Sequence, residues 1–372
     1  MATPLSILDL APVVSGSTPA RALRNTIDLA GRAEQAGYHR YWLAEHHFAP
    51  GVASSATAVL IGLVAAATER IRVGSGAVQL GHQTAVSVVE QFGTLDALHP
   101  GRIDLGLGRS GQRAKEARSA PPPAEAPPVE ARVVNGLLIP PPFSFLPLLR
   151  SPRFAAQAAA LQQPGAEPPD FDEQVGDILA LLAGTYALDD VDLHAVPGEG
   201  ADVQVWILGS SAGQSAQVAG ARGLPFAANY HVSPASVLDA VAAYRDAFRP
   251  GVLARPYVLV SADVVVAPDD TTARELASPY GLWVRDIRTG RGAQPFLSPA
   301  QAAAHEWTDE DRELLADRLE TQFVGAPSTV AERLGVLRDA TGADELLVTT
   351  ITHDHMDRVR SFELLAKEWG LS

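Results

Sequence analysis

Two adjacent histidines follow a short apolar stretch near the N-terminus. The segment Tyr41-Trp42-Leu43-Ala44 leads into Glu45, His46 and His47, and the nearby Pro50-Gly51 pair cannot continue a regular strand. Imidazoles titrate near neutral pH and therefore suit acid–base chemistry. A buried strand that carries polar groups only at its carboxyl end is typical of a parallel sheet or barrel that binds a ligand there.

Adjacent residues of an extended chain point to opposite sides, so we expect at most one of His46 and His47 to face a barrel mouth. A second polar cluster, His353-Asp354-His355, follows a predicted strand near the C-terminus. The spacing of its two histidines would allow zinc binding, but Asp354 is also a suitable helix cap. We therefore predict no metal, and a metal-dependent hydrolase that uses His46, His353 and His355 stays an alternative.

Two glycine- and serine-rich loops have the composition of an anion site. Residues 106–111 read G-L-G-R-S-G, but polyproline follows instead of a second strand that ends in an acid, which argues against a dinucleotide fold. The glycines would let an anion approach the backbone, and Arg109 offers a fork of donors. Gly209-Ser210-Ser211 leaves another predicted strand, and Ser215 opens a helix. Together the loops predict a phosphate pocket; for the serines alone, helix capping is the alternative.

Composition limits the classes of partner. The chain has 372 residues, 47% of them hydrophobic and 19% charged, which is enough to bury a full core. Its net charge of −14 and pI near 5.1 argue against nucleic acid and membrane surfaces as partners. The absence of cysteine excludes disulfides and thiolate ligands. The apolar run at Leu5–Leu10 is too short for a signal sequence, so we expect a cytoplasmic protein.

Strand and helix patterns alternate along the chain. The eight predicted strands are residues 5–10, 39–43, 71–78, 102–107, 203–208, 225–229, 256–266 and 345–350. Helical patterns occupy residues 19–36, 55–68, 84–98, 171–184, 215–222, a stretch from 233, 328–340 and 354–369. This alternation predicts a single-domain (β/α)8 TIM barrel over residues 1–372, rather than an open doubly wound sheet.

Two excursions interrupt the alternation. Thirteen of the 28 prolines fall within the 58 residues 113–170, after the fourth strand, where we expect no regular barrel helix. The second excursion, at 280–307, follows the seventh strand. Both leave from carboxyl ends of strands and are possible lids, and a packing insertion without a catalytic role is the alternative for the first. Gly74-Ser75-Gly76-Ala77 in the third strand is too rich in glycine for simple core packing and predicts close approach of a flat group.

The motifs at residues 44–48, 73–77, 101–109, 208–211 and 342–350, in this order, resemble the bacterial luciferase-like flavin-dependent monooxygenases. The resemblance runs from Leu5 to Leu365 and fails across about 115–170. It implies a catalytic role for His46 and a cis peptide at Gly76-Ala77 that supports the flavin ring. It also places the flavin phosphate on Arg109, Ser211 and Ser215, with Glu45 and Ser210 as further cofactor contacts. Gly108 stands where luciferases proper have cysteine, which argues against light emission.

The resemblance further implies the reaction. Reduced FMN from a separate flavin reductase would serve as co-substrate and react with O2 to a C4a-hydroperoxide, which inserts one oxygen atom into a small hydrophobic substrate. Relatives of this kind are homodimers, and some resemble polyketide-tailoring hydroxylases or epoxidases of antibiotic biosynthesis. His82 and His231 are weaker predictions for the substrate pocket. An F420-dependent hydride-transfer oxidoreductase on the same fold, and a flavoprotein without catalytic activity, stay as alternatives.

Overall fold

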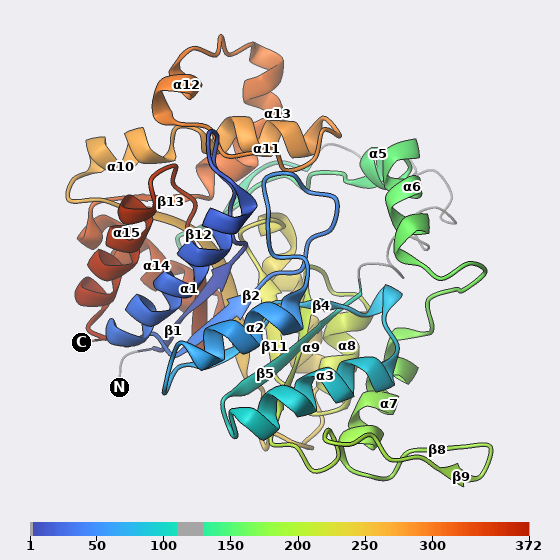
Figure 1. Cartoon of the computed structure of the whole chain (residues 1–372). Helices are drawn as coiled ribbons and strands as arrows, with labels where there is room; N and C mark the ends of the chain where they lie inside the picture. Colours follow the sequence, from blue (N-terminus) through green and yellow to red (C-terminus); the bar gives the residue numbers. More distant parts are fainter. Residues whose placement is uncertain (1–2, 110–128, 372) are drawn as a thin grey trace.

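A closed barrel of eight parallel strands forms the centre of the chain, which a computed structural model describes for residues 3–109 and 129–371. The barrel strands are β1 (Leu5–Asp9), β2 (Arg40–Leu43), β3 (Arg72–Ser75), β5 (Ile103–Gly108), β10 (Gln204–Gly209), β11 (Phe226–Asn229), β12 (Val258–Val266) and β14 (Glu345–Thr349). The pairing of β10 with β5, with Val205 opposite Leu105, closes the barrel. The predicted TIM barrel is therefore confirmed (Figure 1).

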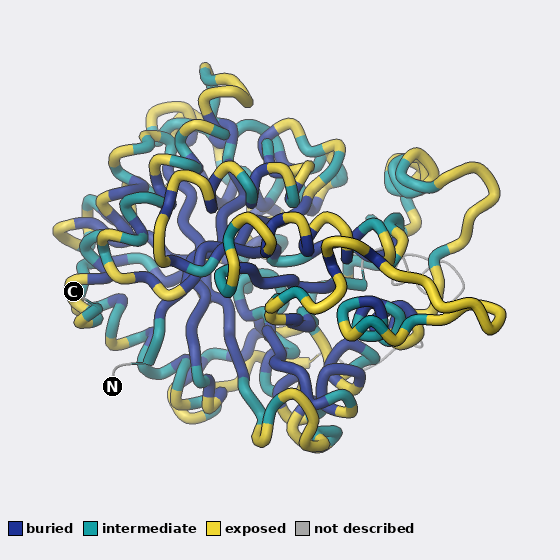
Figure 2. Tube along the Cα trace, turned by 60° about the horizontal axis from the view of Figure 1, so that its bottom comes forward, coloured by how far each residue is buried: buried dark blue, intermediate teal, exposed yellow. Residues whose placement is uncertain are grey.

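Helices surround the barrel and cover its outer face (Figures 1 and 2). They are α1 (Pro19–Gln35), α2 (Thr57–Ala66), α3 (Ala85–Leu98), α7 (Phe171–Leu182), α8 (Gln214–Ala221), α9 (Val237–Ala247), α10 (Asp270–Ala277), α14 (Pro327–Thr341) and α15 (His355–Trp369), with short 3-10 turns η1 (Leu80–His82) and η2 (Pro234–Ser236). Three further helices, α11 (Tyr280–Arg288), α12 (Pro299–Ala303) and α13 (Asp309–Glu320), lie at one end of the barrel, where residues of α11 and α13 line its mouth (Figure 1). Several begin as the sequence predicts: the side chains of Thr18 and Thr84 accept backbone hydrogen bonds as N-caps, and Pro19 occupies the first turn. Across the described residues, no helix is long and apolar enough to cross a membrane.

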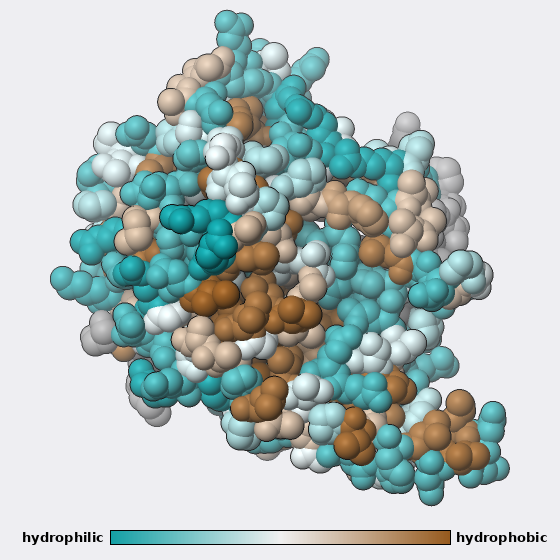
Figure 3. Space-filling view, in the orientation of Figure 1, coloured by the Kyte–Doolittle hydropathy of each residue, from teal (hydrophilic) through white to brown (hydrophobic). Residues whose placement is uncertain are grey.

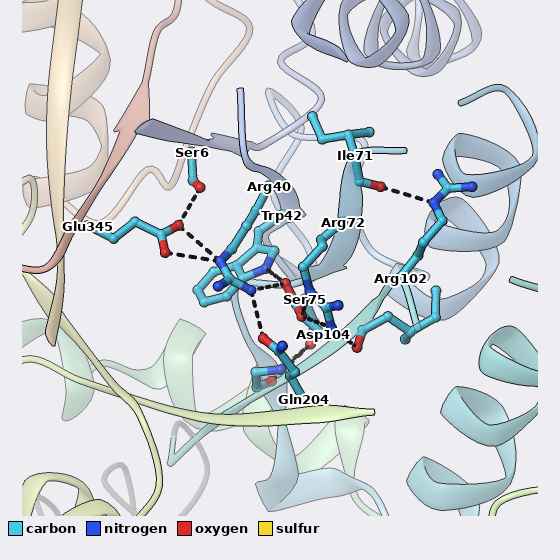
Figure 4. A network of polar contacts seen from close by, with 12 residues as sticks. Ser6, Arg40, Trp42, Ile71, Arg72, Ser75, Arg102, Asp104, Gln204 and Glu345 are labelled. Atoms are coloured by element: carbon cyan, nitrogen blue, oxygen red, sulfur yellow. Dashed lines mark hydrogen bonds and ion pairs between the residues drawn. The ribbon is translucent and has the colours of Figure 1, made fainter. Parts of the chain in front are cut away.

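The amino end of the barrel is filled by a buried charged network (Figure 4). Asp104 accepts hydrogen bonds from Arg40 Nη1 and Trp42 Nε1, both at 2.9 Å, and from Arg72 Nε at 2.8 Å. Arg40 Nε also donates to Glu345 Oε1 at 3.0 Å. Burial alone would lower the pKa of Arg40, but Glu345 and Asp104 raise it, so the guanidinium stays charged. These ion pairs close the end of the barrel that lies opposite the strand carboxyl ends.

The strands differ from the sequence prediction in two places. The third strand is divided into β3 and β4 (Val78–Gln79), because the Gly76-Ala77 peptide bond between them is cis. β13 (Phe323–Gly325) pairs with β12 outside the barrel path and was not predicted, since three residues are too short for a recognisable pattern.

The proline-rich insertion contains regular structure that the sequence analysis did not predict, although its helices are not part of the helix layer of the barrel. Its described part, residues 129–170, has a hairpin of β6 (Arg132–Val134) and β7 (Leu137–Ile139), a short helix α5 (Leu146–Leu149), and α6 (Pro152–Leu161). α6 forms because Ser151 caps it and Pro152 stands in its first turn, where proline lacks only an N–H that would be unpaired anyway. Hydrogen bonds from Tyr230 to the Leu138 carbonyl, at 2.8 Å, and from Gln162 to the Gly81 carbonyl attach the insertion to the barrel. A further hairpin, β8 (Ala187–Leu188) with β9 (Val191–Asp192), projects from the surface (Figure 1).

Candidate active site

A cavity of about 370 Å³ opens at the carboxyl ends of the barrel strands. Its floor and walls are mainly apolar and include Leu8, Leu10, Ala44, Leu208, Leu347 and Ile351. His46, Gly76, Ala77, Ser210 and His231, all predicted from the sequence, also line it. The structure therefore brings five predicted residues from four separate segments to one cavity.

His46 lies at the border between this cavity and a second one of about 750 Å³. His46 is exposed at this border, yet neighbouring protein atoms partly desolvate its imidazole. This desolvation lowers the pKa of His46, although Glu45 acts in the opposite direction. His46 is therefore neutral at pH 7 and can accept a proton at one ring nitrogen while it donates at the other.

Gly76 and Ala77 form one edge of the cavity. Their peptide bond is cis, at the position that the resemblance implied. A Cβ built on Gly76 would lie 2.7 Å from Leu8 Cδ1, so a larger residue at this point would require the Leu8 side chain to move. The backbone is consequently open to close approach from the cavity side.

The two predicted anion loops meet at the start of α8. A Cβ built on Gly213 would lie 3.3 Å from Ser211 Oγ and 3.8 Å from Arg109 Nη1, so a hydroxyl and a guanidinium face the same backbone position. Ser215 is buried in the first turn of the helix. Gln214 ties this turn to the cap of α7 through a 2.9 Å hydrogen bond to Asp170. Residues 110–111 of the predicted glycine motif lie outside the described residues.

Glu45 holds two imidazoles in place. Its Oε1 atom lies 3.0 Å from His47 Nε2 and 2.9 Å from His82 Nε2. Burial opposes ionisation, but the hydrogen bonds and charges of His47 and His82 lower the pKa of Glu45 to about 2. These three residues are the one group in the described chain with the types and spacing of metal ligands. The same contacts also fit a positioning role, in which the Glu45 carboxylate orients His47 and His82 toward the second cavity, which both histidines line.

The histidines of the alternative metal site do not gather with His46. His353 Nε2 lies 3.1 Å from Ser15 Oγ, and His355 Nε2 lies 2.8 Å from Asp28 Oδ2. Asp354 is the N-cap of α15, as the sequence analysis allowed. No group of possible metal ligands among the described residues contains His46, His353 or His355.

A polar wall opposite the apolar one was not predicted. Ser261 and Asp263 face the cavity from β12, together with Arg288 from α11 and Arg318 from α13. Ser261 Oγ lies 2.7 Å from His231 Nδ1. Burial first, and then the charge of Arg318, lower the pKa of His231 to about 3, so this imidazole stays neutral. The alternation of Ser261 and Asp263 within a valine-rich strand was a signal that they point inward, whereas no sequence pattern marked the arginines.

The second cavity lies between the barrel mouth and the insertion. His47, Phe48, Gln79 and His82 line its barrel side, and residues of α6 and the loop after it, from Phe154 to Pro168, line the other. The insertion thus forms a wall beside the predicted catalytic histidine.

A (β/α)8 barrel with a cavity at the carboxyl ends of its strands, lined by a histidine and a glycine edge, has the architecture of enzymes that place their active site at that mouth. The sequence model of the family described as "Luciferase-like monooxygenase" matches residues 3–128 and 171–345, so the chain belongs to this family and is an oxidoreductase. The match omits residues 129–170, the described part of the insertion.

Similar proteins span the whole chain. The chain is 39% identical to the uncharacterized protein YvbT of Bacillus subtilis (strain 168), over 99% of this chain and 97% of that protein. It is 35% identical to a luciferase-like monooxygenase of Escherichia coli (strain K12), over 96% of this chain and 95% of that protein. The crystal structure of apo-MsnO8 superposes with a TM-score of 0.79 at 32% identity, covering 100% of this chain and 99% of that one.

Proposed function

We propose that the chain is an FMN-dependent monooxygenase, which uses reduced FMN from a separate flavin reductase and O2 to place one oxygen atom in a small, largely apolar substrate. The observation that carries the proposal is the convergence of His46, the Gly76-Ala77 edge and the Arg109–Ser211 pair at one mouth of the barrel. β2, β3 and β5 are successive parallel neighbours, so the segments that follow them lie on the same side.

The chain's own residues fit a flavin mononucleotide. Arg109, Ser211 and the first turn of α8 supply the donors that a phosphate monoester requires. Gly76 and Ala77 leave backbone open beside an apolar cavity, which suits a flat ring. Glu45 and Ser210, predicted as further cofactor contacts, differ in position: Ser210 lines the cavity, whereas the Glu45 carboxylate binds His47 and His82.

When bound, reduced FMN supplies the activation of O2 and the transfer of one oxygen atom. His46 holds a proton on one ring nitrogen at the cavity edge and can donate it there or accept one in exchange. Leu8, Leu10 and Leu208 exclude water from the same space. Arg109 and Ser211 would hold the phosphate of the cofactor and so restrict the positions that the rest of the molecule could take in the cavity.

Isotope incorporation tests the reaction. The protein is supplied with reduced FMN, ¹⁸O₂ and a panel of small apolar aldehydes, thioethers and carboxylates, and products are examined by mass spectrometry. We expect one ¹⁸O atom in a product, and no turnover when reduced F420 replaces reduced FMN. Hydride transfer from F420 without incorporation of oxygen would overturn the proposal.

We expect kcat/KM to fall at acidic pH, with a midpoint below 6.5, the ordinary pKa of histidine. Desolvation favours the neutral form of His46, and neutral imidazole is lost only when the pH falls through the lowered pKa. The measurement is kcat/KM between pH 5 and 8 at saturating reduced FMN. A limb centred above 6.5 would contradict the assignment of this limb to His46.

We also propose that two chains associate through the face that carries α2. Val59 is 67% exposed and Leu63 53% exposed on one side of this helix, and Leu98 at the end of the neighbouring α3 is 70% exposed. Figure 3 shows apolar side chains gathered on this face. Exposed apolar patches of this kind are typical of subunit interfaces. Sedimentation equilibrium is expected to give a homodimer that Leu63→Glu weakens; a monomer at micromolar concentration would contradict it.

A further inference from the structure

Buried arginines are almost always paired with acids, because a guanidinium without a counter-charge is costly to remove from water. Four arginines are buried in the part of the chain that the structure describes: Arg40, Arg288, Arg318 and Arg358. Arg40 pairs with Glu345 and Asp104, Arg358 with Asp9, and Arg288 with Asp317. Among the described residues, no carboxylate lies within 4.0 Å of the Arg318 guanidinium. Arg318 is therefore an exception that needs a physical reason.

Arg318 and Arg288 line the same cavity but differ in their surroundings. Arg288 forms a bidentate pair with Asp317, at 2.5 and 2.7 Å, and its guanidinium stacks 3.9 Å from the Phe143 ring centroid. Its charge is neutralised by the protein itself. Arg318 directs Nε, at 3.1 Å, and Nη2 to the same uncharged acceptor, the Tyr280 hydroxyl. It is only 5% exposed, and the space that it faces is the cavity.

Asp263 is the acid that interacts electrostatically with Arg318, but it forms no ion pair within 4.0 Å of the guanidinium. The Tyr280 hydroxyl, which accepts from Arg318, interacts with the same carboxyl group. Asp263 also accepts a 3.1 Å hydrogen bond from Gln322. Burial raises the pKa of Asp263, and Arg318 only partly opposes this. His231, on the same wall, stays neutral because its pKa is about 3. The wall therefore presents a buried guanidinium that has no carboxylate of the described residues within 4.0 Å and that lines the cavity.

We infer that Arg318 binds a carboxylate of the substrate, so that the substrate class is a small apolar carboxylic acid. A carboxylate is the anion that a guanidinium recognises in fork geometry, and it would supply the missing counter-charge. Trp283, Val284 and Ile287 line the cavity beside Arg318 and would hold the apolar part of the molecule. This inference rests on the proposed function for the identity of the bound molecule as a substrate, but carboxylate binding itself does not require turnover.

Calorimetric titration of the full chain, with and without FMN, tests the inference with hexanoate and its neutral analogue hexanamide at pH 7. We expect hexanoate to bind at least about tenfold more tightly, the advantage of a charge-assisted over a neutral contact. In Arg318→Gln the ratio of the two affinities should fall to about one. Arg318→Lys, which keeps the charge but not the fork, should give an intermediate ratio.

Arg333→Gln is the matched control. Like Arg318, which lies 5.4 Å from the Tyr280 ring centroid, Arg333 lies over an aromatic ring, 4.9 Å from the Phe323 centroid, but it does not line the cavity. It should keep the full preference for hexanoate. The unfolding midpoint of each variant separates binding from folding: a structural Arg318 would lower the midpoint without changing the ratio. Equal affinities for both probes in the unmodified protein, or an unchanged ratio in Arg318→Gln, would overturn the inference. Because no turnover is measured, loss of carboxylate preference and failure of FMN-dependent oxygenation are independent outcomes.

Discussion

Replacement of His46 by alanine is expected to reduce oxygenation by about 10²-fold or more, the usual contribution of a positioned acid–base group. His46 is the neutral imidazole at the border of both cavities, so its loss removes the proton donor and acceptor nearest to the proposed ring site. FMN affinity should change only a few-fold, because the phosphate donors lie elsewhere. Turnover of the substrate that gains ¹⁸O and fluorescence titration with FMN provide the two measurements.

Arg109→Ala serves as the opposite control for His46→Ala. It should weaken FMN binding by roughly 10- to 100-fold, since a hydrogen bond to a charged group contributes about 1.5–3 kcal/mol. At saturating FMN its kcat should remain near that of the unmodified protein. If His46→Ala instead lost flavin affinity and turnover in parallel, His46 would be a structural residue and the catalytic assignment would fail.

Replacement of Asp104 by asparagine should lower the free energy of unfolding by about 3–5 kcal/mol, the range for breaking a buried ion pair. The Asp104 carboxylate is fully buried and accepts from Arg40, Arg72 and Trp42. An amide of the same size would remove the negative charge and turn an N–H₂ group toward guanidinium donors. Urea unfolding measures the change.

Asp172→Asn is the control for this prediction. Asp172 also pairs with an arginine, Arg222, at 2.6 Å, but its side chain is 52% exposed. Surface pairs contribute little, so the loss should stay within about 1 kcal/mol. A similar loss for both variants would show that burial of the Asp104 network adds no stability.

The barrel could be predicted from the sequence because its strands are short apolar runs with helical patterns between them, as at Arg40–Leu43 and Glu345–Thr349. The glycine edge and the histidine pair could be predicted because unusual residues stand at strand ends. The Arg109–Ser211 pair was predicted as two separate loops. The two loops meet at Gly213 because β5 pairs with β10 and closes the barrel. These strands are about 100 residues apart in sequence, so no local pattern indicates the contact.

The polar wall of the cavity could not be predicted in the same way. Tyr280 comes from α11 in the second excursion and Arg318 from α13, which follows that excursion, and nothing in a helical pattern distinguishes a charged residue that turns inward from one in solvent. The helix α6 in the insertion was not predicted for a different reason: proline density argues against helix interiors, but Pro152 stands in the first turn of α6, where proline is tolerated.

The insertion between β5 and α7 forms a cavity wall that is separate from the barrel strands. Its described part, residues 129–170, forms one side of the cavity next to His46 but contributes no strand to the barrel, and the family model does not include it. A change of sequence in this part therefore alters the cavity wall without altering the pairing of the barrel strands. Transplanting residues 129–170 between family members is accordingly a route to altered substrate range that leaves the common scaffold intact.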